Sequence, residues 1–284
     1  MSLRRRSWLV PSILAFGFAF LYVPILSMIV YSFNNSRLVT VWDSAHSPTL
    51  KWYAALLSNH QILDAAWLSL QIAAVNATVA AILGTLVGLV LARFGSFRGR
   101  TLLSALTTAP LVMPEVITGL SLLLLFVALE QLIGWPSGRG FTTIAIAHIT
   151  FSMSYVAVIV QSRLSGFDES LEEAAMDLGA RPSRVFRRIT LPLIFPAILS
   201  GWLLAFTLSW DDLVISQFVA GPGSTTLPMV IFSKVRLGVT PDVNALATVM
   251  VLVVATGVVV SAIVMRRQDK KRQREVQMAL ASGD

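Results

Sequence analysis

The chain has 284 residues, of which 55% are hydrophobic and only 13% are charged. This composition excludes an ordinary soluble domain and indicates an integral membrane protein. The absence of cysteine excludes a disulfide framework and any cysteine-ligated metal site. The formal net charge of +7 does not indicate a nucleic-acid partner, because the basic residues flank apolar runs and form no nucleic-acid-binding motif.

Six runs with little or no charge each exceed the roughly 20 residues that a helix needs to cross the hydrocarbon core of a bilayer. They are residues 8–33, 65–92, 101–128, 141–162, 189–219 and 245–265. Only helices satisfy their own backbone polar groups in lipid at these lengths, so the sequence predicts an all-α integral membrane protein with six transmembrane helices. The first run is too long for a signal peptide and lacks a small-x-small cleavage site, so it is predicted to remain as a span.

Basic residues are distributed asymmetrically between the segments that join these runs. Of the 22, 17 lie in the N-terminus, the turn at 93–100, the segment after the fourth run and the C-terminal tail. The remaining five are Arg37, Lys51, Arg139, Lys234 and Arg236. By the positive-inside rule, both termini and the segment at 166–190 are predicted to be cytoplasmic. The tail at 266–284 is predicted to lie against anionic lipid headgroups.

The chain is divided into a first span with an outer loop (1–64), a core of five spans (65–265) and the basic tail. The outer loop is long enough for an interfacial helix at 51–57, where Trp52 and Tyr53 suit the headgroup level. A second long outer connection, at 221–242, is interrupted by prolines. Both loops are candidates for contact with an external protein.

The segment between the fourth and fifth runs has the pattern of two short helices. Ser170 and Glu173 match a capping box, which predicts a helix from about Leu171, and Gly179 is typical of a helix end. Pro182 favours the start of a second helical turn. On physical grounds alone, this segment is either a docking site outside the bilayer or a solvated loop that only joins two spans.

Three acidic residues lie inside the predicted spans: Glu115, Asp211 and Asp212. A charge at that depth costs about 2.5 to 3.5 kcal/mol, so such residues normally face a cavity or a partner. No Lys or Arg lies at comparable depth in the sequence, which favours a cationic substrate or ions in a wet cavity. Helical neighbours point about 100° apart, so only one aspartate is expected to face a path, and Asp212 is preferred. The alternative is that the aspartates begin a short outer helix or bond to Ser209 and Ser216.

Other polar and aromatic residues in the spans have weaker signals. Trp202, Trp210 and Tyr155 would add cation–π attraction if they line the same cavity as the acids. His148 and Asn76 are lone polar residues in apolar runs, and each is expected to make an interhelical hydrogen bond.

The sequence predicts no catalytic residues and no metal site. It contains no Gly-x4-Gly-Lys-Ser/Thr, no His-Glu-x2-His and no Gly-x-Ser-x-Gly, so the chain has no P-loop of its own for ATP. Two other classes stay open. A self-sufficient channel or secondary transporter would use Glu115 and Asp212 as ion sites, and an intramembrane enzyme would use the same acids with a nucleophile or metal that the sequence does not supply.

The motif Glu-Ala-Ala, three residues, Gly, nine residues, Ile-x-Leu-Pro at 173–192 resembles the coupling loop of permease subunits of bacterial ABC importers. Stretches at 109–119, 172–179, 211–214, 226–228 and 244–248 extend the resemblance to putrescine/spermidine importer permeases over nearly the full chain. It implies the type I ABC importer permease fold. It also implies ATPase coupling through Glu173, Ala174, Ala175, Asp177, Gly179, Ile189, Leu191 and Pro192.

The resemblance implies a permease in the bacterial inner membrane that forms the translocation path for polyamines by alternating access. The implied partners are a second permease in a heterodimer, two copies of an ATPase that binds ATP and Mg²⁺, and a periplasmic polyamine-binding protein. The chain itself is expected to hold no cofactor and to contact membrane lipids. Another small cationic or neutral solute is the alternative cargo, because the lack of a basic residue at depth argues against anions.

Overall fold

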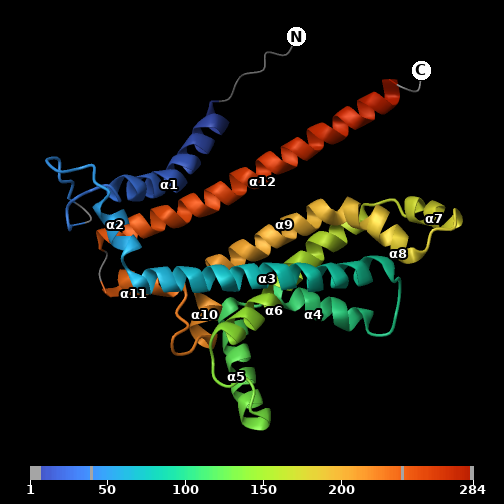
Figure 1. Cartoon of the computed structure of the whole chain (residues 1–284), viewed down its shortest axis with the longest axis horizontal. Helices are drawn as coiled ribbons and strands as arrows, with labels where there is room; N and C mark the ends of the chain where they lie inside the picture. Colours follow the sequence, from blue (N-terminus) through green and yellow to red (C-terminus); the bar gives the residue numbers. More distant parts are fainter. Residues whose placement is uncertain (1–7, 39–40, 238–239, 282–284) are drawn as a thin grey trace. The chain divides into compact units, whose positions relative to one another are not determined.

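The computed structural model describes residues 8–38, 41–237 and 240–281. Within these ranges every regular element is a helix (Figure 1), and six of the helices are long and apolar enough to cross a membrane. These six are Leu9–Tyr31, His60–Arg93, Glu115–Ile133, Phe141–Ser165, Pro182–Trp210 and Pro241–Val260. The predicted all-α class with six spans is therefore confirmed.

The chain forms two compact units, Met1–Leu63 with Ile231–Asp284, and Asp64–Val230. The first unit contains α1 (Leu9–Tyr31), α2 (Lys51–Leu57) and α12 (Pro241–Ala281). Helix α2 confirms the predicted helix at 51–57, and α12 continues through residues 266–281 of the predicted tail.

In the described part of the loop before α2, several hydrogen bonds converge on Asn34. Its side-chain amide donates to the carbonyl oxygen of Val41 at 2.7 Å, and its side-chain oxygen accepts the Asp43 N–H at 2.9 Å. The indole N–H of Trp52 donates to the Asn34 carbonyl oxygen at 2.7 Å. Trp52 is thus tied to this outer loop by its polar atom, while its ring supplies apolar surface.

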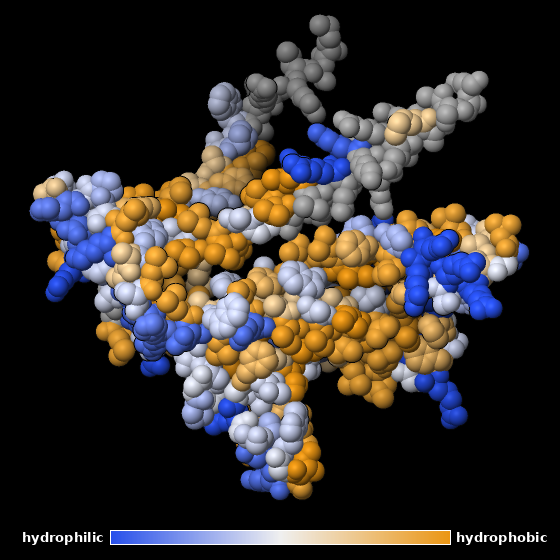
Figure 2. Space-filling model, in the orientation of Figure 1, coloured by the Kyte–Doolittle hydropathy of each residue, from blue (hydrophilic) through white to orange (hydrophobic). Residues whose placement is uncertain are grey.

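The second unit is built around α6, because more of its span is buried than that of any other span in the described structure. Its helices are α3 (His60–Arg93), α4 (Arg100–Val112), α5 (Glu115–Ile133), α6 (Phe141–Ser165), α7 (Ser170–Asp177), α8 (Pro182–Val185), α9 (Leu191–Trp210) and α10 (Val214–Val219), and α11 (Leu227–Leu237) starts in it. One apolar cluster joins α3, α5, α6 and α10, and a second joins α3, α6 and α9. Figure 2 shows apolar side chains along the long helices, as expected for surface that faces lipid.

Small residues let α3 approach α6 closely. A Cβ atom added to Gly84 would lie 2.6 Å from the Val156 Cβ, and one added to Gly88 would lie 2.9 Å from the Ala157 carbonyl oxygen. Any side chain at these positions would force the helices apart, so both glycines are required for the contact.

Asn76 joins three helices in the same region. It is fully buried on α3, and its amide nitrogen donates to Ser152 Oγ on α6 at 3.1 Å and to the Ala205 carbonyl oxygen on α9 at 2.7 Å. A buried amide without such partners would be costly in an apolar interior. The predicted interhelical role of Asn76 is confirmed.

The third span differs from the prediction of one helix over 101–128. Helix α4 ends at Val112 and α5 begins at Glu115, and Figure 1 shows α5 leaving the direction of α4. Met113 is extended, with φ −75° and ψ 137°, because the ring of Pro114 disfavours the helical conformation of the residue before it. Hydropathy does not register this break. Helix α4, with 13 residues, is too short to cross a membrane by itself, whereas α5, with 19, is long enough.

The fifth span also differs from the prediction of one helix over 189–219. It starts earlier, at Pro182, and passes through a π-helical turn at Phe186–Thr190 before α9. The wider turn leads into a helix whose second residue, Pro192, has no N–H to continue the α-helical pattern. Helix α9 ends at Trp210, so both predicted membrane aspartates lie at a break rather than inside a helix.

Candidate functional site

The ends of α3 and α6 and the start of α9 meet at one end of the second unit, together with α7 and α8 (Figure 1). We call it the basic end, because Arg93, Arg100 and Arg163 lie there with the arginines of α8 and the π-helical turn. The Arg100 guanidinium donates to the Leu91 carbonyl oxygen at 2.9 Å and so satisfies an acceptor at the end of α3. The positive-inside rule predicts that this end is cytoplasmic.

Helix α7 begins without the predicted capping box. In the described loop, no side chain caps the helix; instead Asp168 Oδ1 accepts the Ser170 N–H at 3.0 Å. This bond holds the pKa of Asp168 below its usual value, because it favours the ionised carboxylate. Gly179 has φ +83°, and its N–H donates to the Met176 carbonyl oxygen at 2.9 Å. The predicted role of Gly179 as a helix end is confirmed.

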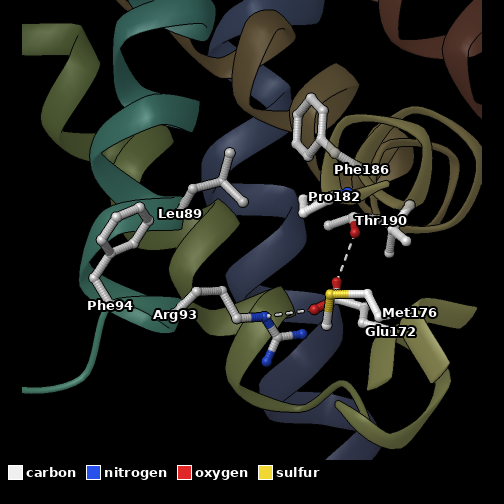
Figure 3. Close-up of a pocket in the computed structure, with 9 residues that line it drawn as sticks. Leu89, Arg93, Phe94, Glu172, Met176, Pro182, Phe186 and Thr190 are labelled. Atoms are coloured by element: carbon white, nitrogen blue, oxygen red, sulfur yellow. Dashed lines mark hydrogen bonds and ion pairs between the residues drawn. The ribbon is translucent and has the colours of Figure 1, made fainter. Parts of the chain in front are cut away.

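Arg93, the last residue of α3, contacts α7 and the loop before it. Its guanidinium pairs with Glu169, its Nε lies 3.5 Å from Glu172 Oε2, and it stacks over the Phe167 ring at 5.9 Å. Glu172 Oε1 in turn accepts a hydrogen bond from Thr190 Oγ1 at 2.6 Å (Figure 3). Arg93, Glu172 and Thr190 were not predicted as site residues, because no local sequence pattern indicates contacts between residues so far apart in the chain.

A cavity of about 260 Å³ lies between the end of α3 and the α7–α8 segment (Figure 3). Its walls are mostly apolar, and the Arg93–Glu172–Thr190 contacts form its polar side. The lining residues are Leu89, Arg93, Phe94, Glu172, Met176, Pro182, Val185, Phe186 and Thr190. Helix α7 is therefore not closely packed against α3 here.

The predicted coupling residues fall into two groups. The exposed residues are Glu173, Ala174, Asp177, Gly179 and Pro192, and the partly buried residues are Ala175, Ile189 and Leu191. The neighbouring Leu178 is 89% exposed, and no described atom lies within 4 Å of a Cβ placed on Gly179. The exposed face of α7 and of the turn after it is thus not covered by other described residues. We call this face the outer surface of α7.

The helices that follow the two breaks, α5 and α10, pack against each other. Glu115 is exposed at the first position of α5, and Asp212 lies between α9 and α10. A Cβ added to Gly119 would lie 2.7 Å from Phe218 Cδ2 and 3.3 Å from Ile215 Cα, so α5 and α10 are in close contact one turn after Glu115. All three membrane acids therefore flank a pair of interrupted helices.

Asp212 contacts His148, a partner that was not predicted from the sequence. His148 Nε2 lies 3.0 Å from Asp212 Oδ2, and His148 Nδ1 lies 2.7 Å from Ser209 Oγ. Asp212 also accepts the N–H groups of Ile215 at 3.2 Å and Ser216 at 2.7 Å, so it caps α10. The interhelical role of His148 is confirmed, and so is the alternative in which an aspartate begins a short helix.

The remaining predicted path residues lie in different surroundings. Asp211 is exposed, whereas Asp212 is 7% exposed in its side chain, so exposure favours Asp211 over the preferred Asp212. Trp202 and Trp210 stack on either side of Phe206 along α9, with ring centroids 5.5 and 6.0 Å apart. Tyr155 packs against the α3–α5–α6–α10 cluster, whereas Trp202 packs against the other, so these aromatics do not line one surface.

The chain matches the family described as "Binding-protein-dependent transport system inner membrane component" over residues 84–274. It is 57% identical over 267 residues to the putrescine transport system permease protein PotI of Escherichia coli (strain K12), covering 94% of each chain. It is 41% identical over 259 residues to the spermidine/putrescine transport system permease protein PotC of the same organism, covering 91% of this chain and 94% of that one.

Solved structures show the same fold at low sequence identity. A bacterial ABC transporter involved in the import of the acidic polysaccharide alginate superimposes with a TM-score of 0.72 at 17% identity, over 93% of this chain and 96% of that one. The MetNI methionine ABC transporter gives a TM-score of 0.61 at 17% identity, over 72% of this chain and 94% of that one. At these identities the likeness concerns the fold alone.

Proposed function

Because this chain belongs to the family of inner-membrane components of binding-protein-dependent transport systems, we propose that it is the permease through which an ATP-driven importer moves putrescine or spermidine. The chain is a multi-pass subunit of the inner membrane, ATP is hydrolysed by a separate subunit, and a binding protein belongs to the same system. The observation that carries the polyamine proposal is the 57% identity to a putrescine permease over 94% of both chains.

In this proposal the permease works in a larger assembly. It pairs with a second permease as a heterodimer, and the pair binds two copies of the ATPase and a periplasmic polyamine-binding protein. The described helix α1 supports this, because none of its residues is buried and most of its apolar side chains are exposed, where lipid or a second subunit would cover them.

The ATPase is proposed to dock on the outer surface of α7. Glu173 and Asp177 present carboxylates there. Leu178, which does not lie in one of the long apolar helices, presents an apolar side chain that is 89% exposed. A single exposed leucine is common on protein surfaces, so the docking proposal is supported by the exposure of the motif residues around it and not by Leu178 alone. ATP binding would then move α7, and α7 would move the spans that lead to it.

The substrate is proposed to pass the pair of helix breaks. Interrupted helices at such sites leave backbone groups and helix ends that transporters use to bind polar cargo. Glu115 and Asp211 are exposed there and free to meet a cation, whereas Asp212 is held by His148 and by the first turn of α10. A polyamine passing a narrow, poorly hydrated segment needs such counter-charges, because desolvation and Coulomb energies grow as the dielectric constant falls.

The proposed cargo is tested by reconstituting the permease with its partner subunits in vesicles. We expect ATP-dependent uptake of radiolabelled putrescine or spermidine, competed by unlabelled polyamine and not by a neutral amino acid. A complex whose ATP hydrolysis responds to another solute, without uptake of either polyamine, would exclude the polyamine and favour the alternative cargo. Uptake by the permease without the ATPase would instead indicate a self-sufficient secondary transporter.

A further inference from the structure

We propose that Arg93, Glu172 and Thr190 form a bracket that fixes α7 to the ends of two spans, so that α7 and these spans move together. Arg93 ends α3, Glu172 lies in α7, and Thr190 immediately precedes α9. These are positioning residues, because they act through α7. The inference rests on the proposed function of α7 as the surface that binds the ATPase.

The first arm of the bracket joins α3 to α7. The Arg93 and Glu172 side chains are only 15% and 17% exposed, and the Arg93 Nε lies 3.5 Å from Glu172 Oε2. Arg93 also pairs with the more exposed Glu169, so it faces two carboxylates. Its position in the last turn of α3 adds a favourable interaction with the helix dipole.

The second arm joins α7 to the start of α9. Thr190 is 5% exposed in the π-helical turn, and its hydroxyl donates to Glu172 Oε1 at 2.6 Å. One carboxylate thus uses one oxygen for each span (Figure 3). The bond from Thr190 is a charge-assisted hydrogen bond, which is shorter and stronger than a neutral one, whereas the contact with Arg93 is an ion pair at 3.5 Å.

Apolar packing cannot replace this connection. None of the residues of the described helix α7 is buried, and a cavity of about 260 Å³ separates it from the end of α3. The cavity leaves few close contacts between α7 and the end of α3, so the packing of α7 is against α8 and the π-helical turn. The polar bracket therefore carries much of the mechanical link between α7 and α3.

The adjacent residues Glu172 and Glu173 have different surroundings and different proposed roles. Glu172 faces inward to Arg93 and Thr190, whereas Glu173 is exposed on the outer surface. Neighbouring helical residues point about 100° apart, which allows one to bind the span ends while the other faces a partner. Replacing Glu172 should therefore weaken transmission of motion, whereas replacing Glu173 should weaken binding of the ATPase.

The first test measures coupling in the complete transport complex. The readout is the ATP hydrolysed per polyamine imported, with assembly checked for each variant. We expect Arg93→Gln and Glu172→Gln to raise this ratio roughly fivefold, the lower end of typical coupling effects. Arg93→Lys retains the charge and should lie closer to wild type. Arg163→Gln, at an exposed arginine near the end of α6, is the matched control and should keep the wild-type ratio.

The second test needs no ATPase, because it follows α7 directly. The chain has no cysteine, so Leu178→Cys and Leu102→Cys introduce two unique sites for spin labels, at side chains that are 89% and 64% exposed. Pulsed electron paramagnetic resonance on the permease in lipid should give a narrow distance distribution. Arg93→Gln, Glu172→Gln and Thr190→Val should each broaden it, and Arg163→Gln should not.

The two readouts separate failure of the bracket from failure of the proposed function. An unchanged distance distribution in all three bracket variants would overturn the bracket. Broadening with an unchanged ATP ratio in the complete complex would leave the bracket in place as a structural link and overturn its role in coupling. If Leu178→Asp on the outer surface also left transport and ATP hydrolysis unaffected, the proposed docking function of α7 would fail instead.

Discussion

Replacing His148 by alanine removes the contact that holds the break between α9 and α10. The imidazole lies 2.7 Å from Ser209 Oγ at the end of α9 and 3.0 Å from Asp212 Oδ2 at the start of α10. His148 is 3% exposed and Asp212 is 7% exposed in their side chains, so water cannot freely replace the lost partner. We expect the two short helices to lose their fixed relative orientation.

The expected magnitude follows from the polar contacts that are lost, to Ser209, Asp212 and Ser216. The Ser216 contact, at 3.2 Å, shares Nε2 with the Asp212 contact, so two hydrogen bonds are counted. A hydrogen bond to a charged group contributes about 1.5 to 3 kcal/mol in soluble proteins. Hydrogen bonds between membrane helices average about 0.6 and reach about 1.7 kcal/mol. On the membrane scale, His148→Ala loses one hydrogen bond to a charged group and one to a neutral group. It also leaves the nearly buried Asp212 carboxylate without its imidazole partner. We therefore expect His148→Ala to lower the unfolding free energy by about 1 to 3 kcal/mol.

The assay is unfolding of the purified permease in mixed micelles, followed by circular dichroism as the denaturing detergent increases. Thr150→Ala is the matched control, because the Thr150 hydroxyl bonds only within α6, to the Ile146 carbonyl oxygen at 2.8 Å. His148→Gln keeps an amide donor and should lose less stability than His148→Ala. Equal stability of His148→Ala and Thr150→Ala would refute the reasoning, because the contact would then contribute nothing measurable.

Three further predictions concern orientation, coupling and packing. A reporter active only in the periplasm should be silent when fused after Gly179 and active after Gly138, and the reverse pattern would overturn the orientation. Gly179→Asp places a side chain at φ +83° on the open surface of α7, so transport and stimulated ATP hydrolysis should fall while the permease still inserts; wild-type transport would contradict a coupling role. Gly84→Leu should destabilise the permease by about 1 to 3 kcal/mol in the unfolding assay, because even a Cβ would lie 2.6 Å from the Val156 Cβ, and unchanged stability would show that the two helices can separate without cost.

Hydropathy was sufficient to predict the spans, because burial in lipid constrains every residue of a helix in the same way. It did not predict the helix breaks, since a break depends on local backbone geometry. Met113 carried a readable signal, as the residue before Pro114, and the Asp211–Asp212 pair carried another, as two acids near the end of an apolar run. The first was not interpreted as the end of a helix, and the second was interpreted so only in the alternative that the aspartates begin a short helix.

It was harder to predict which residues of the site contact one another than to predict which residues belong to it. Gly179 was recognised because its conformation is a local property, and its positive φ confirms that interpretation. The sequence shows no Lys or Arg at the depth of Asp212, and His148 was not assigned to it, because only the packing of α6 against α9 and α10 brings His148 near. Arg93 and Glu172 were missed for the same reason.

The most direct test of the account is the removal of charge at the helix breaks. Glu115→Gln and Asp211→Asn keep nearly the same shape, so they separate electrostatics from packing. In vesicles that hold the complete complex, we expect each to lower uptake of radiolabelled putrescine and spermidine by about tenfold or more, equivalent to roughly 1.4 kcal/mol in the rate-limiting barrier. Assembly of the complex should not change. Unimpaired uptake in both variants would contradict the proposal that these carboxylates guide a cationic substrate through the permease.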